Sequence, residues 1–500
     1  MEDNLVFALD GRCNPNTQRT GQHLTIMANW HRDQIAFESI DFARLRSLTV
    51  FGEWYSFFIS GKMRRLRVLD LEGMVALTNE DIEQIFVKLL SLKFISLREC
   101  REISHLPDTL GGLRQLQTLD VRWTSIVKLP SAIIKLHELQ YIRAGAIVLP
   151  DEDWKSASTE DGDVVTNQLP ATTSEELDGR DSSISSGRPA VPTCTENAES
   201  PAQATTSQEA QHPKVGRLAS KLSHTWSLCG SKPRKEAQHH NGGLGVPVGI
   251  ESLTALHTVG VVNVNASGGE AFLKQLAKLT QLLKLRVCGI NKKNWPLLCS
   301  ALSDKNCHLE SLSVRFDEDC LDDSFKPPKT LKSLKLYGPI RKLPDTIKDV
   351  FNFEKLDLEM TITSQDDIHL FLKDKLPRRD ILNRLCIKVQ GDKAVNFSSN
   401  EFDYDGNWSG SFRPRVVKID CSSKLEVTVG SIIRYAEVLI IQCSEGSFFR
   451  VSGGRDGLSG MYGIKAVWLK GSYSEEQRVH LKELVDRHSR KPVLKVEPLQ

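Results

Sequence analysis

The phrase Leu-x-x-Leu-x-Leu, or a close aliphatic variant, recurs along this chain at a nearly constant interval. It is clearest where it begins at Leu66, Leu92 and Leu116, and the steps are 92 − 66 = 26 and 116 − 92 = 24 residues. Apolar side chains at the first, fourth and sixth positions indicate a short strand that buries one face. Equivalent strands would stack in parallel, about 4.8 Å apart. The chain is therefore expected to present a long surface rather than a deep cleft.

A second feature shares the period of the first. Leu106-Pro107 and Leu129-Pro130 are separated by 130 − 107 = 23 residues, which equals the step of 139 − 116 = 23 between strands. Proline fixes φ and donates no hydrogen bond, so it suits the side of a repeat that lies away from the sheet. Two features with one period predict a leucine-rich-repeat solenoid of the α/β class. We expect a curved parallel sheet with an irregular or helical convex side.

The repeat pattern is interrupted once. Residues between about 151 and 245 are rich in Ser, Thr, Glu, Gln, Ala and Pro and contain almost no aromatic side chains. Such a segment cannot bury enough apolar area to offset the entropy lost on ordering, so it is interpreted as a disordered insertion. Its basic part, 214–235, is read either as a short amphipathic helix or as a solvated tail. The predicted organisation is 1–41 linker or cap, 42–150 repeats, 151–245 insertion, 246–474 repeats and 475–500 cap.

Bulk composition gives little support for a nucleic-acid or membrane partner. The 65 basic and 63 acidic residues leave a net charge of +2, so no partner is implied by charge alone. No apolar stretch of about 18 residues predicts a membrane span, and the N-terminus has no secretory signal. The eleven cysteines form no C-x-x-C pair, which favours a reducing compartment. We expect a cytoplasmic protein.

No motif predicts catalysis, a cofactor or a metal. His239-His240 has no further spaced ligands. A phosphate-binding loop requires G-x-x-x-x-G-K-[ST], but around Gly61-Lys62 the first glycine is replaced by Ser56 and the hydroxyl residue by Met63. We therefore expect a binding protein rather than an enzyme.

Residues between the inward aliphatics of each strand should point to the concave face. In the first block these are largely charged. Equivalent positions on neighbouring strands lie within side-chain reach, so Glu72 should meet Arg98, and Asp120 should meet Arg143, with Arg122 nearby. The spacing predicts a ladder of acid–base pairs, each contributing only about 0–1 kcal/mol.

The second block should carry a different concave surface. It places three basic and two aromatic residues near one another: Arg286, Arg315, Lys335, Phe316 and Tyr337. No acid occupies the neighbouring positions until Asp357. Basic residues beside aromatics are typical of binding hot spots, so this set is a hypothetical site for an acidic protein surface. An ordinary solvated face is the alternative.

The chain resembles the leucine-rich-repeat region of plant intracellular immune receptors, the nucleotide-binding leucine-rich-repeat (NB-ARC-LRR) disease-resistance proteins, most closely those of grasses. The resemblance covers about 40–150 and 246–500 and is carried by four phrases: Leu45–Gly52, Leu66–Gly73, Leu106–Val121 and Val467–Val493. Full receptors of this kind add a signalling helix bundle and a P-loop switch module. Because the P-loop motif is missing, no nucleotide site is transferred to this chain, which resembles the sensor half alone.

The resemblance implies a recognition and autoinhibitory role in plant defense. Expected partners are an NB-ARC switch module in cis or in trans, and a pathogen effector or guarded host protein. Three alternatives remain open: a repeat scaffold or ubiquitin-ligase substrate adaptor, a repeat-bearing enzyme with a catalytic cysteine, and a non-functional receptor fragment.

Overall fold

The computed structural model describes most of the chain as one solenoid unit. The residues described are 6–10, 21–145, 242–348, 354–364, 382–389, 393–396, 414–421, 424–428, 433–445, 448–451 and 457–497. The predicted disordered insertion falls almost wholly outside them, as does the basic segment 214–235.

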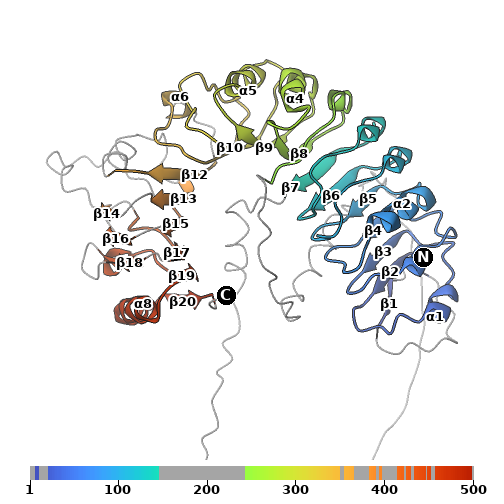
Figure 1. The fold of residues 1–500 in the computed structure, drawn as a ribbon, viewed down its shortest axis with the longest axis horizontal. Helices are drawn as coiled ribbons and strands as arrows, with labels where there is room; N and C mark the ends of the chain where they lie inside the picture. The colour runs from blue at the N-terminus through green and yellow to red at the C-terminus, as the bar shows by residue number, and fades with distance from the viewer. Residues whose placement is uncertain are drawn as a thin grey trace, which may run out of the picture. The chain divides into compact units, whose positions relative to one another are not determined.

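Seventeen strands form one sheet in which each strand pairs in parallel with the next. Along the sheet they are β1 (Val6–Leu9), β2 (His23–Ile26), β3 (Ser47–Val50), β4 (Val68–Asp70), β5 (Phe94–Ser96), β6 (Thr118–Arg122), β7 (Tyr141–Gly145), β8 (Thr258–Asn263), β9 (Lys284–Ile290), β10 (Ser311–Phe316), β11 (Ser333–Tyr337), β12 (Lys355–Ile362), β13 (Leu382–Val389), β15 (Val416–Cys421), β17 (Val438–Cys443), β19 (Ala466–Gly471) and β20 (Val493–Val496). Figure 1 shows these strands along the inner side of the unit. The predicted leucine-rich-repeat solenoid is confirmed.

The core is built by the leucines that define the repeat. Strand side chains alternate between faces, so the fourth and sixth positions of every unit point away from the concave side. Leu69, Ile95 and Leu119 are fully buried and stack on one another through β4, β5 and β6. Together with the leucine that opens each phrase, they form one hydrophobic cluster from Leu9 to Val485. Each short unit obtains a hydrophobic core only by stacking on the neighbouring units.

The two repeat blocks form one continuous sheet. Tyr141 and Ile142 of β7 pair in parallel with Thr258 and Val259 of β8. Leu244 and Gly245, placed within the predicted insertion, also belong to the solenoid. Leu244 bridges Val262 and Gly245 bridges Lys128.

The outer side carries helices and single turns (Figure 1). The α-helices are α1 (Gln34–Glu38), α2 (Asn79–Lys88), α4 (Gly269–Gln275), α5 (Trp295–Leu302), α6 (Asp345–Lys348) and α8 (Glu475–Arg487), and the 3-10 turns are η1 (Ser56–Phe58), η2 (Asp108–Gly112), η3 (Ser131–Lys135), η6 (Ile250–Ser252), η7 (Leu276–Lys278) and η8 (Leu458–Gly460).

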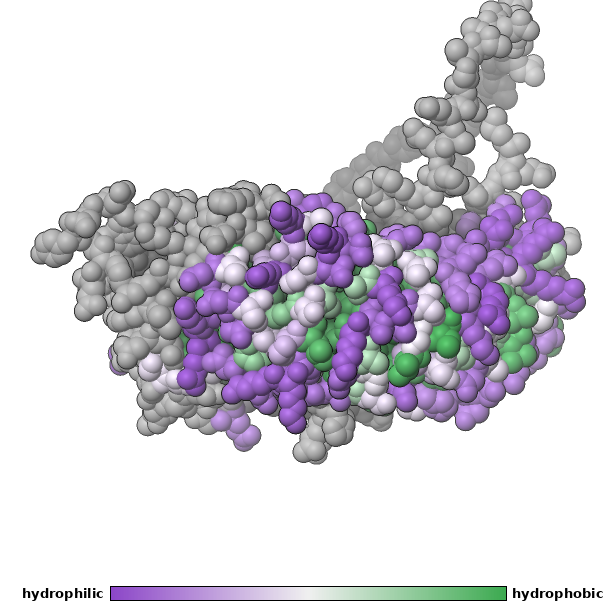
Figure 2. All heavy atoms as spheres, turned by 90° about the horizontal axis from the view of Figure 1, so that it is seen from above, coloured by the Kyte–Doolittle hydropathy of each residue, from purple (hydrophilic) through white to green (hydrophobic). Residues whose placement is uncertain are grey.

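Pro107 and Pro130 precede η2 and η3, with φ of −71° and −67°. The predicted role of the prolines on the convex side is confirmed. In the view of Figure 2, hydrophilic side chains cover most of the described surface and interrupt the hydrophobic ones.

The N-terminal end differs from expectation. The sheet begins at β1 rather than near Leu45, and the repeat pattern did not predict β2 because this strand supplies only Leu24 and Ile26 as inward residues and lacks the full phrase. In the predicted cap, α8 buries Leu481, whereas Val479 is 44% exposed. A capping box fixes the start of α8, where the Ser474 hydroxyl accepts from the Gln477 amide. A second sheet contains β14 (Lys393–Asn396), β16 (Lys424–Thr428) and β18 (Phe448–Val451), and Phe449 and Val451 of β18 are buried in the core.

Three register shifts occur among the described strand pairs, and the one between β8 and β9 changes which side chain faces inward. Between β8 and β9, Val259 pairs with Leu285 but Val261 pairs with Arg286, so Gly260 is an extra residue. Val262 therefore takes the inward place predicted for Val261. A β-bulge of this kind places two residues opposite one.

Candidate protein-binding face

The candidate site is the concave face of the sheet, where β4 to β7 carry charged side chains in register. Asp70 pairs with Ser96, Ser96 with Asp120, and Asp120 with Arg143 across the parallel ladder. The strands hold these positions at fixed spacing because their inward neighbours are locked in the core.

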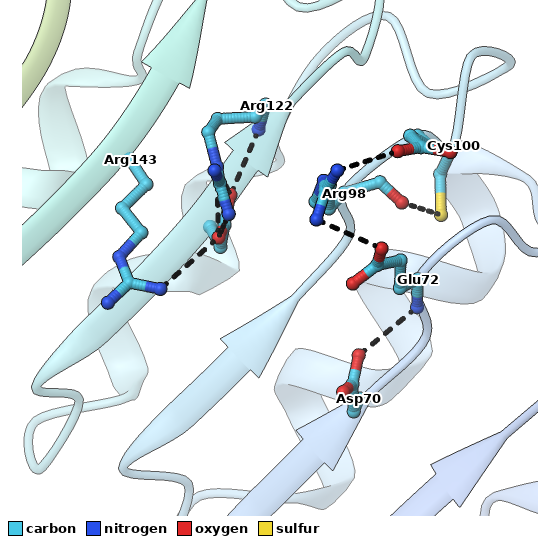
Figure 3. Close-up of polar contacts among 8 residues, drawn as sticks. Asp70, Glu72, Arg98, Cys100, Arg122 and Arg143 are labelled. Carbon is cyan, nitrogen blue, oxygen red and sulfur yellow. Dashed lines mark hydrogen bonds and ion pairs between the residues drawn. The ribbon is translucent and has the colours of Figure 1, made fainter. Parts of the chain in front are cut away.

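The predicted acid–base ladder of the first block is present. Arg98 Nη1 lies 3.2 Å from Glu72 Oε1, and Arg143 Nη1 lies 3.7 Å from Asp120 Oδ2. Arg122 Nη2 lies 2.7 Å from the same Asp120 oxygen. Figure 3 shows Arg98 reaching toward Glu72, and Arg122 and Arg143 side by side on the neighbouring strands.

Burial and hydrogen bonding compete at the acidic members of this ladder. Burial raises the pKa of Asp70, although the Glu72 amide donates to its carboxylate at 3.2 Å (Figure 3). Burial also raises the pKa of Glu72, and the charge of Arg98 opposes that rise. The guanidinium groups therefore favour the ionised carboxylates in a partly desolvated row. Arg143 is the most accessible arginine of the three, with 46% of its side chain exposed.

Two of the three basic residues predicted on the second block, Lys335 and Arg315, have acidic partners. Lys335 Nζ lies 3.3 Å from Asp357 Oδ2, and Lys355 Nζ lies 3.4 Å from the same atom. Arg315 approaches Glu359 at 3.9 Å. Asp357 and Glu359 are buried. The expected basic surface is thus largely neutralised from within the sheet.

Lys335 and Asp357 form a buried ion pair in which desolvation outweighs attraction. Burial lowers the pKa of Lys335 to about 8, while the charge of Asp357 opposes the shift. Only 9% of Lys335 is exposed. Its availability to a partner is therefore small.

The two predicted aromatic contacts are both buried. Phe316 lies in the core, where its ring meets Trp295 edge-on at 5.2 Å, so its placement on the concave face was wrong. The cause is the irregular register between β9 and β10, where Phe316 pairs with Ile290. Tyr337 faces the concave side but is covered, and the Arg315 guanidinium lies 5.7 Å from its ring centre. Arg286 pairs in register with Ser313 on β10.

Sequence reasoning missed two polar residues beside this pair, one of them a buried arginine. Arg384 on β13 is in register with Asp357 and is buried. The preceding Asn383 is an extra residue in the ladder, and its amide donates to Asp357 at 2.9 Å. The repeat spacing predicts neither position. In a regular ladder Asn383 would lie opposite Asp357, but the bulge shifts the register by one residue and places Arg384 there.

No group of three metal-binding side chains occurs among the described residues. Burial raises the pKa of the Cys100 thiol to about 12 and that of Cys299 to about 11. Such thiols are poor nucleophiles at neutral pH. Within the described residues, no helix is long and apolar enough to cross a bilayer.

A sheet of stacked leucine-rich strands with polar pairs on its open side defines a leucine-rich-repeat protein. A family model described as "Leucine-rich repeat region" matches residues 44–157. The chain is similar to plant disease-resistance proteins, in agreement with the resemblance found in its sequence.

Three similarities can be stated in numbers. The rice (Oryza sativa subsp. japonica) disease resistance protein Pik-2 is 26% identical over 378 residues, covering 74% of this chain and 31% of the relative. The rice disease resistance protein RGA4 is 37% identical over 101 residues, or 20% of this chain and 10% of the relative. A solved leucine-rich-repeat protein from Leptospira interrogans covers 96% of both chains at 13% identity, with a TM-score of 0.36. The chain thus spans about a third of the length of Pik-2.

Proposed function

We propose that this chain acts as the recognition and autoinhibitory region of a plant intracellular immune receptor, in the cytoplasm, and that it works by protein–protein binding on its concave face. Its partners would be an NB-ARC switch module in cis or in trans, and a pathogen effector or guarded host protein. Binding, not catalysis, would be its contribution. The resemblance to rice disease resistance proteins supports the class of process.

The observation that carries this proposal is the row of paired charges on β4 to β7. Arg122 and Arg143 share Asp120 as a partner, so two cations meet one carboxylate. An acidic surface could pair with Arg143 at little cost, because Arg122 would still neutralise Asp120. Partly exposed charges on a rigid sheet favour selectivity and fast association.

The proposed mechanism is competition between two partners for one face. Contacts to a switch module would hold that module inactive, and contacts to a ligand would replace them. A ligand shifts such a balance only by its differential affinity for the two states. The charged row of the first block, together with Arg286 and Arg315, would supply contacts whose strength differs between the switch module and the ligand.

The test is capture of a receptor's nucleotide-binding module by the purified chain. Arg122→Glu with Arg143→Glu reverses two charges on the concave face and should weaken capture about tenfold or more. Lys278→Glu with Lys293→Glu makes the same charge change at exposed convex positions and should leave capture within about twofold. Equal capture by both double variants would reject the concave face as the binding surface.

A rapidly alkylated thiol would favour the enzyme alternative. We expect iodoacetamide at pH 7 to leave Cys100, Cys288 and Cys299 unmodified in the folded chain, because each is buried with a raised pKa. Peptide mapping after a short pulse of reagent shows which thiols have reacted, and so distinguishes a catalytic cysteine from buried, unreactive ones.

A further inference from the structure

One edge of the sheet, where the strands begin, carries an unusual concentration of arginine. Arg46 and Arg67 directly precede β3 and β4, and the Arg67 amide donates to the Arg46 carbonyl at 2.8 Å. Lys93 continues this column, since its amide donates to the Arg67 carbonyl at 2.8 Å. Three successive repeats therefore stack like charges about one strand spacing apart.

A second column comes from the turns that enter these strands. The turn from Met63 to Leu66 closes by a bond from the Leu66 amide to the Met63 carbonyl at 3.1 Å, and presents Arg64 and Arg65 outward. The next two repeats use the same turn and place Ser91 and Gln115 where the first places Arg65. The repeat geometry thus aligns a guanidinium, a hydroxyl and an amide along the edge.

Between them these columns line a polar depression of about 290 Å³. Its walls are Arg46, Arg64, Arg65, Arg67, Ser91 and Gln115. No acidic, aromatic or aliphatic residue lines it. Among the described residues, no ion pair is formed by any of the four arginines.

Further along the chain, a basic residue at the same edge of the sheet has an acidic partner. There Lys332 Nζ lies 2.8 Å from Glu310 Oε1, in the repeats of β10 and β11. The unbalanced arginines are therefore a local feature of β3 to β6 rather than a property of the repeat. Like charges held this close repel one another, and a bound anion would relieve that repulsion.

We propose that this depression binds a small anion with two or more phosphate groups. Arginine presents a planar fork of donors that matches phosphate oxygens in pairs, and the hydroxyl of Ser91 and the amide of Gln115 add neutral donors. The volume is at the lower end of small-ligand sites. A protein partner would require aromatic or apolar anchors at the centre of its contact, and this lining contains none.

The assignment is tested by measuring the binding of inorganic tripolyphosphate to the full chain by calorimetry at low ionic strength. Arg64→Gln with Arg65→Gln removes two exposed side chains from the turn and should weaken binding about tenfold or more. The matched control is Lys329→Gln with Lys332→Gln, which removes two charges from the equivalent turn and strand edge before β11. The control should bind within about twofold of the unmodified chain.

Three results would overturn the proposal. They are the absence of saturable binding, equal weakening in the arginine variant and its control, and equal or tighter binding of a hexaglutamate peptide. The last would reassign the edge to an acidic protein segment. If the double variant does not fold, as judged by circular dichroism, the single variant Arg67→Gln provides the same comparison.

Discussion

The ion pairs of β4 to β7 and those of β11 to β13 occupy the same concave rows but differ in burial. In the first region the side chains of Glu72 and Arg98 are 35% and 29% exposed, although that of Asp120 is only 3% exposed. In the second, the Asp357 side chain is fully buried and that of Glu359 is 3% exposed. One repeat rule has therefore produced a ladder with a partly exposed pair at Glu72 and Arg98 in one block and a network whose acids are all buried in the other.

The difference in burial sets what each pair does. An exposed pair contributes little to folding and remains available to a partner. A buried pair costs free energy to desolvate, and the loss of one member leaves an uncompensated charge. Recognition is therefore expected to depend on the first region, and stability to be sensitive in the second.

Removing the central acid of the buried network should have the largest effect. Asp357→Ala leaves Lys335 and Lys355 without their shared carboxylate, and we expect a loss of about 3–5 kcal/mol in the free energy of unfolding. Urea denaturation measures it. Glu310→Ala, which breaks an exposed pair in the same block, is the control and should cost less than about 1 kcal/mol. Equal losses would remove the distinction between the regions.

The pH dependence of stability gives a second comparison. Because burial lowers the pKa of Lys335 from 10.5 to about 8, the unfolded chain binds more protons than the folded chain between these values. The cost of burying this charge is therefore complete below pH 8 and disappears as pH rises toward 10.5.

The chain should accordingly gain stability relative to Lys335→Met over that interval. Buried thiols with raised pKa act in the opposite direction, so the difference between the two proteins is the quantity to follow by urea denaturation. A difference that stays constant from pH 8 to 10.5 would show that Lys335 is not desolvated.

The junction between the blocks should tolerate no added side-chain atom. A Cβ at Gly260 would lie 2.4 Å from the Ala144 amide nitrogen across the β7–β8 contact. We expect Gly260→Ala to lower the free energy of unfolding by about 1–3 kcal/mol. Gly61→Ala is the matched control, because nothing lies within 4 Å of the added atom. An unchanged stability in Gly260→Ala would contradict the close approach of these strands.

The smallest effect is expected in the first region. Glu72→Gln should change the free energy of unfolding by less than about 1 kcal/mol, since its pair with Arg98 is partly exposed. Thermal denaturation is sufficient to check this. A larger loss would place the first region with the second as a structural network.

The rows that the repeat spacing fixes could be predicted from sequence. Glu72, Arg98, Asp120 and Arg143 were assigned to neighbouring positions by counting from the inward leucines, and the ion pairs confirm those neighbours. The count holds because β4 to β7 pair without a bulge.

Where the ladder is irregular, the same count fails. Gly260 and Asn383 are extra residues, and Phe316 turns into the core at a third irregularity. No local sequence pattern marks these sites, because a bulge is decided by packing between strands that are distant in sequence. Burial of the second charged region is likewise a tertiary property that spacing alone does not reveal.

The central claim is one continuous parallel sheet across the two repeat blocks, and cysteine cross-linking tests it directly. Tyr141 and Thr258 are parallel partners on β7 and β8, about 4.8 Å apart at a typical strand spacing, which a disulfide can span. Tyr141→Cys with Thr258→Cys should form an intramolecular disulfide on mild oxidation, whereas Tyr141→Cys with Lys284→Cys, one strand further along, should not. Failure of the first pair to cross-link, or equal cross-linking of both pairs, would contradict a single solenoid.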